Sequence, residues 1–212
     1  MKKIAVFIYP YFSIQEISCL SSALVLNYNQ KIEVFASNTT QAIVSEEGFT
    51  FYADKSFDMF IANDYSCVIL PGIYNPLPAL FDDNLISSLR TLQGKDILIA
   101  AISSAPLLLA KANLLAETLF TAGIWDEIIT YFSFIPDHNF CRKPVVVDKK
   151  IVTAIGFAFR EFAIEVIKCL ELDTCENGLF NGITKEYSEK ELTYQMGKDN
   201  FKEFLAEYNR YL

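Results

Sequence analysis

Short apolar runs alternate along this chain with segments whose apolar residues recur every three or four positions. The runs at 3–9, 31–37, 66–72 and 97–102 have no helical period and predict buried strands. The spacing of Ile14, Ile17, Leu20 and Leu24 predicts a helix between the first two, and residues 82–92 predict another. This alternation is typical of a mostly parallel sheet with helices on both faces. We therefore expect an α/β fold built as a three-layer sandwich.

Two further segments predict antiparallel pairs beside the parallel strands. Residues 42–54 read as a ribbon that turns at Glu47 and Gly48, and residues 143–156 read as two strands joined at Asp148 and Lys149. A helix is expected over 159–170. Composition changes near residue 171, so we expect one domain over 1–212, with a core at about 3–170 and a C-terminal helical extension at about 171–212.

Composition excludes several classes of function. The net charge of −8 argues against binding to nucleic acid or to anionic membranes, both of which require clustered basic side chains. A single histidine, His138, rules out a multi-histidine metal site, and five cysteines without CxxC spacing indicate reduced thiols. No secretory signal or membrane span is recognisable. A cytoplasmic protein that uses no metal or cofactor is expected.

The most informative local pattern lies at residues 97–106. An apolar strand ends in Ser103, Ser104 and Ala105, and Pro106 suits the first position of a helix. A side chain on such a sharp turn is held above the sheet, near the positive end of the helix dipole. Ser103 is the candidate nucleophile. The alternative is an ordinary connection in which Ser104 or Ala105 caps the helix.

Glu16 is the second candidate, because it lies in the first turn of the first helix, just past a strand end. It could point into the same crevice as Ser103. The alternative is structural: Ser13 and Glu16 have the spacing of a capping box, in which the glutamate bonds back to a backbone N–H.

Four segments, in order, resemble the ThiJ/PfpI family, a branch of the class I glutamine amidotransferase-like superfamily. They are YPYFSIQEI, CVILPG, AAISSAPLLLAKANLL and VVVDKKIVTAIG. The resemblance implies a flavodoxin-like fold, a small-molecule ligand or substrate and a homodimer. Members include intracellular proteases or amidases, glyoxalase-type enzymes, chaperones and sensor domains. The resemblance also places Glu16 in the active crevice.

The chain departs from the family pattern at three positions. Ser103 replaces the usual elbow cysteine, Gly123 stands where a histidine is frequent, and Ile73 replaces the second glycine of the LPGG motif. Backbone N–H groups near Gly72, Ile73 and Ser104 are the expected oxyanion hole.

Four residues are expected to line the substrate pocket: Tyr11, Gly123, Trp125 and Phe157. Because a serine hydroxyl needs an adjacent base, Ser103 depends on Glu16 or on His138. His138 lies in the loop at 136–141 and is expected to be solvated. Three functions stay open: an amidase-type hydrolase with Ser103 in place of cysteine, a non-catalytic small-molecule binder or sensor, and a chaperone-like stress protein.

Overall fold

The computed structural model describes residues 3–172, 198–199, 202 and 206. The chain divides into two compact units, Met1–Phe180 and Asn181–Leu212, and every element named below lies in the first. The helical extension expected at 171–212 falls mostly outside the described residues.

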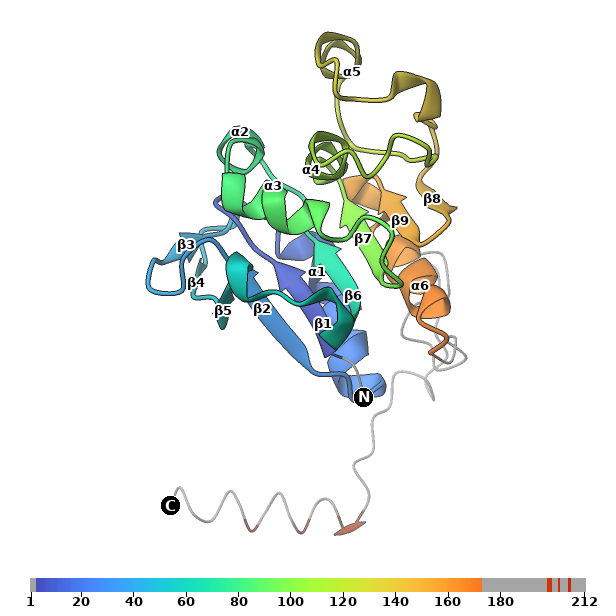
Figure 1. Cartoon of the computed structure of the whole chain (residues 1–212). Helices are drawn as coiled ribbons and strands as arrows, with labels where there is room; N and C mark the ends of the chain where they lie inside the picture. The colour runs from blue at the N-terminus through green and yellow to red at the C-terminus, as the bar shows by residue number, and fades with distance from the viewer. Residues whose placement is uncertain (1–2, 173–197, 200–201, 203–205, 207–212) are drawn as a thin grey trace. The chain divides into compact units, whose positions relative to one another are not determined.

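A seven-stranded sheet with the order β5-β2-β1-β6-β7-β9-β8 forms the centre of the first unit (Figure 1). Neighbouring strands run parallel except for β8, which is antiparallel to β9. The strands are β1 (Lys3–Phe7), β2 (Ile32–Ala36), β5 (Lys55–Ser56), β6 (Tyr65–Leu70), β7 (Leu98–Ile102), β8 (Val145–Asp148) and β9 (Ile151–Ala154). The mostly parallel sheet predicted from the alternating pattern is confirmed.

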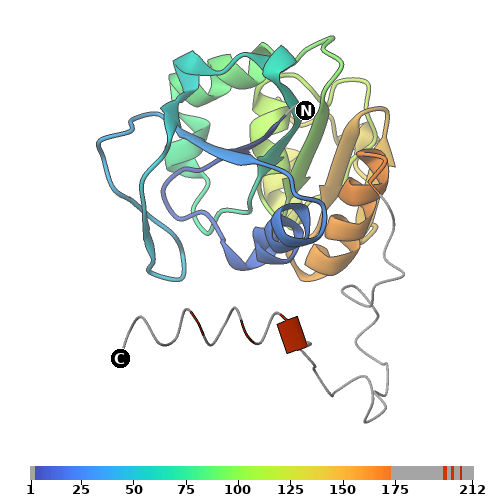
Figure 2. The same cartoon turned by 90° about the horizontal axis from the view of Figure 1, so that it is seen from below.

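Helices cover both faces of this sheet. On one face α1 (Gln15–Ser22), which continues as the π-helix η1 (Ala23–Asn27), packs against α6 (Phe159–Cys169). The other face carries α2 (Leu77–Leu80), α3 (Asp83–Arg90) and α4 (Pro106–Lys111), as Figure 2 shows. The three-layer arrangement is thereby confirmed. Among the described residues, no helix is long and apolar enough to cross a membrane.

Shorter elements lie outside the three layers. The predicted ribbon forms the antiparallel pair β3 (Ile43–Val44) and β4 (Thr50–Phe51), with Gly48 at a φ of +86° in its turn. The α-helix α5 (Asp126–Tyr131) follows the loop after α4. The 3₁₀ turns are η2 (Phe57–Met59), η3 (Ala62–Asp64), η4 (Asp137–Asn139) and η5 (Gly156–Ala158).

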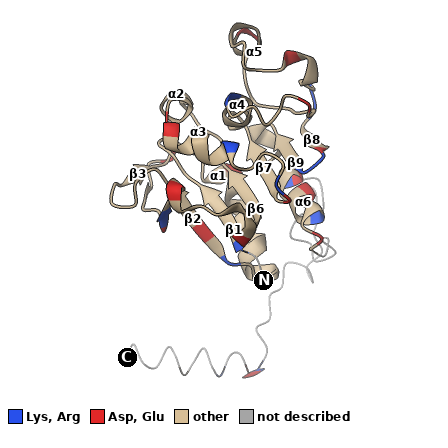
Figure 3. Ribbon diagram, viewed as in Figure 1, with Lys and Arg blue, Asp and Glu red and all other residues tan. Residues whose placement is uncertain are grey.

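The central strands form the core because they are apolar on both faces. Every residue of β7 is buried, and β6 is buried except for the half-exposed Ser66. Figure 3 shows no charged residue along either strand, while charged residues lie on the helices, loops and outer strands. Strands covered by helices on both sides require such continuous apolar runs.

The strand order places a crevice at the carboxyl ends of the central strands. The chain leaves β1 toward β2 on one side, and the later strands β6, β7 and β9 continue on the other side. Loops that depart in opposite directions from neighbouring strands leave space between them, which is where open α/β sheets bind ligands. Glu16, Gly72, Ser103 and Gly156 all follow strands that end at this edge.

Candidate active site

Ser103 lies on a strained turn between β7 and α4. Its φ is +61°, a left-handed conformation that is uncommon for any residue with a side chain. Two short backbone hydrogen bonds hold it there: the Ser103 N–H donates to the Ala154 carbonyl, and the Gly123 N–H donates to the Ser103 carbonyl, both at 2.7 Å. Such conformations persist only where the surroundings impose them, and they gather at functional sites.

The turn is not an ordinary helix cap. The N-cap of α4 is Ala105, and no side chain caps the helix. The Ser104 hydroxyl instead accepts the Ile73 N–H at 3.0 Å and donates to the Ile73 carbonyl at 2.7 Å. Ser104 therefore joins the loop after β6 to the serine turn and does not cap the helix, whereas Ala105 is the N-cap by position, as the alternative expected, without a side-chain hydrogen bond.

The capping-box alternative for Glu16 is also wrong, because a residue of the ribbon accepts the hydrogen bonds at the start of α1 instead. The Glu47 carboxylate accepts the Ser13 hydroxyl at 3.1 Å and the Gln15 N–H at 3.0 Å. The Ser13 N–H, which a capping box would give to Glu16, donates to the Gly72 carbonyl at 2.8 Å. Glu16 is therefore not needed at the helix end and turns toward the crevice.

The Glu16 carboxyl has surroundings that disfavour its charge. Its Oε2 is buried, with no hydrogen-bond partner in the described part of the chain. Burial is the main reason that its pKa is raised to about 7, and the nearby carboxylates of Glu46 and Glu47 add to the rise. The Ser103 hydroxyl and the Gly72 N–H lower the pKa, but by less than burial raises it. A carboxyl that titrates near neutral pH can both accept and donate a proton.

Two glycines let Glu16 and Ser103 approach each other. A Cβ atom on Gly72 would lie 1.7 Å from Glu16 Oε2 and 2.6 Å from Ser103 Cβ. A Cβ on Gly156 would lie 2.3 Å from Glu16 Oε1 and 3.2 Å from Ser103 Oγ. The carboxyl and the hydroxyl therefore share one small space, with Gly72 and Gly156 as its walls.

The oxyanion donors differ from the expected set. The Ile73 N–H already donates to the Ser104 hydroxyl, so it is not open to a ligand in this structure. The Gly72 N–H lies against the Glu16 carboxyl. No acceptor within the described residues takes the Ser104 N–H, which directly follows the nucleophile candidate. Ser104 is thus the best-placed oxyanion donor of the three.

A cavity of about 550 Å³ opens beside these groups. Gly123, Trp125 and Phe157 line it together with Glu16 and Ser103. Tyr11, which was expected there, does not line it. Eight further residues outside the predicted pocket set also line it: Ser13, Gln15, Glu46, Ala122, Ile124, Ile155, Gly156 and Phe159. Most of these are sequence neighbours of predicted positions. Glu46 belongs to the ribbon, and no local sequence pattern predicts that it lies in this cavity.

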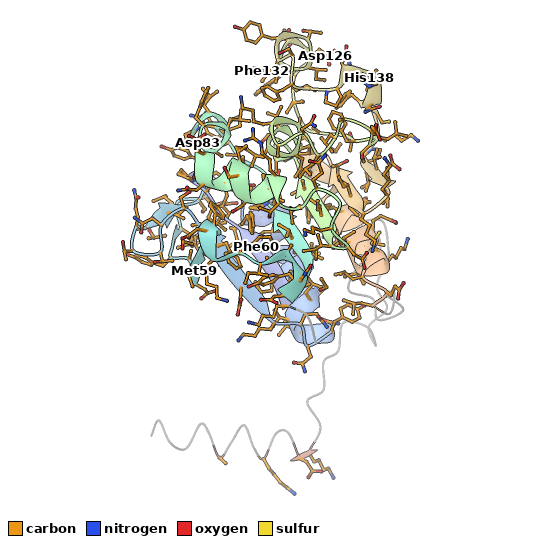
Figure 4. All side chains as sticks on the ribbon, in the orientation of Figure 1. Met59, Phe60, Asp83, Asp126, Phe132 and His138 are labelled. Carbon is orange, nitrogen blue, oxygen red and sulfur yellow. The ribbon has the colours of Figure 1, made fainter. Side chains whose placement is uncertain are left out.

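His138 does not take part in this site. It lies in η4, is exposed, and has its Nδ1 3.7 Å from an Asp137 oxygen. Figure 4 shows it in the same part of the molecule as Asp126 and Phe132, and it does not line the cavity. No cysteine lines the cavity either, and the described residues hold no group of three metal-ligating side chains. Glu16 is the acid–base group that shares the space beside Gly72 and Gly156 with Ser103.

Comparison with known proteins agrees with the fold and the order of these segments. The DJ-1/PfpI family, also called ThiJ/PfpI, matches residues 2–169. The "Uncharacterized protease YdeA" of Bacillus subtilis (strain 168) is 30% identical, over 84% of this chain and 87% of that protein. "DJ-1 protein homolog E" of Arabidopsis thaliana is 26% identical over 68% of this chain, which spans only 37% of the plant protein.

Solved structures show the same fold. The DJ-1 superfamily protein Atu0886 from Agrobacterium tumefaciens has a TM-score of 0.74 at 23% identity, covering 83% of this chain and 93% of that one. The chain belongs to the DJ-1/PfpI family.

Proposed function

We propose that the protein is a small-molecule hydrolase of amidase or esterase type, in which Ser103 is the nucleophile and Glu16 the general base. One observation carries the proposal: a strained serine at a strand-to-helix turn adjoins a carboxyl whose pKa is raised to about 7. The curated relative named as a protease supports a hydrolytic activity in this family.

The residues suggest a two-step acyl transfer. Glu16 accepts the proton of the Ser103 hydroxyl as Oγ bonds to the carbonyl carbon of the substrate, and the Ser104 N–H stabilises the resulting oxyanion. The leaving amine or alcohol departs with the proton held by Glu16. Water then attacks the acyl-serine, gives a proton to Glu16, and releases the acid as that proton returns to Ser103.

A binding protein without turnover is the second candidate, and the Ile73 N–H favours it. Because this donor is engaged by the Ser104 hydroxyl, the site offers one fewer group for an oxyanion than expected. The cavity and its aromatic lining would still hold a ligand. The chaperone-like alternative has no comparable support from the crevice.

Labelling with a fluorophosphonate probe, followed by intact-mass measurement, separates the two candidates. We expect one adduct on the wild-type protein and none on Ser103→Ala. Glu16→Gln should label about 100-fold more slowly, because it lacks the base. Ser133→Ala, which removes an exposed serine that does not line the cavity, is the matched control and should label like the wild type.

The pH dependence adds a second test. Because the ionised form of Glu16 is the base, the labelling rate should rise with pH and level off above a midpoint near 7. An absence of any adduct on folded protein would contradict the hydrolase and favour the binding protein. The homodimer expected from the family resemblance is a separate proposal, which light scattering of the full chain would test.

A further inference from the structure

We infer that the crevice beside Ser103 takes small organic cations, such as alkylammonium compounds with an apolar body. The inference deepens the proposed function, and its turnover part rests on that proposal. The support is the make-up of the cavity wall, which combines two carboxylates with three aromatic rings and has no basic side chain among its lining residues.

Within the described residues, the lining of the cavity carries acidic side chains and no basic one. Glu16 and Glu46 both line the cavity, and they lie close enough for Glu46 to disfavour the charged form of Glu16. Of the arginines nearest in sequence, Arg142 forms an ion pair with Asp126 at 2.7 Å. The Arg160 guanidinium lies 5.9 Å from the centroid of Phe159, so this ring of the wall already has a cation beside it, and Trp125 and Phe157 are the rings left for a ligand. A cleft lined by charge of one sign concentrates ligands of the opposite sign and repels those of the same sign.

The aromatic part of the wall suits the same class of ligand. Trp125 is 73% exposed and Phe157 is 96% exposed, although both line the cavity. Phe159 lines it as well. Aromatic faces carry partial negative charge and attract ammonium groups within about 6 Å, and their apolar surface also accommodates the methyl groups of such ligands.

A second cavity of the protein lacks this combination of acidic side chains and aromatic rings. The cavity of about 720 Å³ around the turns at 93–96 and 149–150 is lined by Lys95, Lys149 and Lys150 among others, and by no aromatic residue. Its acidic side chains have nearby cations, as in the ion pair of Lys150 with Asp96. Within the described residues, acidic side chains without a basic one and exposed rings therefore occur together in the lining of the Ser103 crevice and not in this larger cavity.

The chain carries its own reporter for a binding test. Trp125 is its single tryptophan, so fluorescence quenching or enhancement comes from the cavity wall. We would titrate the full chain with choline, with 3,3-dimethylbutan-1-ol, which has the same shape and no charge, and with the anion 3,3-dimethylbutanoate. Choline should bind at least about tenfold more tightly than the alcohol, and the anion most weakly. Equal affinities, a preference for the anion, or no binding of choline would overturn the inference.

Two variants test which side chains provide the preference. Glu46→Gln should reduce the ratio of choline to alcohol affinity by about threefold or more, because one of the two charges is lost. Asp58→Asn, an exposed acid remote from the crevice, is the matched control and should keep the ratio. An unchanged ratio in Glu46→Gln would overturn the role of that carboxylate. Because Glu46 is exposed, the variant should fold like the wild type, and circular dichroism checks this.

The failure of this inference can be told from the failure of the proposed function. Choline and its isosteres contain no acyl bond, so their binding to the wild-type protein is measured independently of any turnover. Binding without fluorophosphonate labelling would support the cation site and contradict the hydrolase. Labelling without a preference for choline would support the hydrolase and contradict the cation site. If both hold, acetylcholine should be hydrolysed with a higher kcat/KM than 3,3-dimethylbutyl acetate.

Discussion

Glu16, half-buried in the crevice, and Glu33, buried on β2, are two glutamates in opposite surroundings. The Glu33 carboxylate pairs with Lys3 and Lys55, and it accepts the Tyr65 hydroxyl at 2.5 Å. In the described part of the chain, the charges that act on Glu16 come from other carboxylates, and its Oε2 has no hydrogen-bond partner.

The two surroundings move the pKa values in opposite directions. Hydrogen bonds from Lys3, Tyr65 and Lys55 outweigh burial and lower the pKa of Glu33 to about 2. Burial outweighs the Ser103 and Gly72 contacts and raises the pKa of Glu16 to about 7. Burial alone therefore does not decide the state of a carboxyl. A compensated carboxylate contributes to stability, whereas an uncompensated one costs stability and is available for proton transfer.

The largest expected change in stability comes from Glu33→Gln. The substitution removes the negative charge and one of the two acceptor oxygens that serve two lysines and a buried tyrosine, so it should lower the free energy of unfolding by about 2–4 kcal/mol at pH 7. Because the folded pKa lies below the ordinary value, this contribution is complete above about pH 4.5 and is lost as the pH falls through about 2. Urea denaturation at several pH values measures it.

The matched control for that experiment is Glu165→Gln, which removes a surface ion pair with Lys168. Its effect should stay within about 0.5 kcal/mol, as is usual for exposed pairs. Equal losses in the two variants would show that the cluster around Glu33 is no stronger than a surface pair.

Glu16→Gln should change the free energy of unfolding in the opposite direction from Glu33→Gln. The folded pKa of about 7 lies above the ordinary value of 4.5, so the ionised carboxyl costs stability as the pH rises between these values. The glutamine removes that cost and should stabilise the protein by about 1–2 kcal/mol at pH 8, with no gain near pH 4. Thermal unfolding at the two pH values checks this. A variant less stable than the wild type at pH 8 would show that Glu16 is a structural residue.

Of the three substitutions at Glu33, Glu16 and Gly156, Gly156→Ala should change the stability least, and it should clearly slow the labelling of Ser103. The added methyl group would lie 2.3 Å from Glu16 Oε1, so the carboxyl must move away from Ser103. We expect a loss of about 1 kcal/mol in stability and about tenfold slower fluorophosphonate labelling. Gly123→Ala is a matched comparison, because its Cβ would meet Ser103 Cα at an ordinary 3.5 Å. If the two variants slow labelling equally, the position of Glu16 is not the cause.

Most of the sheet could be predicted from the sequence, because its signals are local. Each predicted parallel strand exists, with β1 ending at Phe7 rather than at residue 9. The strand β5 was missed, since two residues carry no periodic pattern. The turns at Gly48 and Lys149 were predicted because each separates two apolar runs. Both residues have a positive φ in the structure.

The site was only partly predictable. Ser103 and Glu16 were singled out from the strand ends and the family resemblance, but each had a local capping alternative that the sequence could not reject. Tyr11 was expected in the pocket because it follows β1, whereas its backbone bonds to Val44 and Tyr74 and its side chain lies outside the cavity.

The sequence by itself determined the parallel sheet and the sharp turn at Ser103, because these follow from residue order and short-range pattern. Tertiary structure decided the role of Glu16. Glu47, 31 residues further along the chain, satisfies the start of α1, and Ser104 occupies the Ile73 N–H across the crevice. These contacts depend on which distant groups the fold brings within hydrogen-bond distance of each other, and residue order alone does not give that.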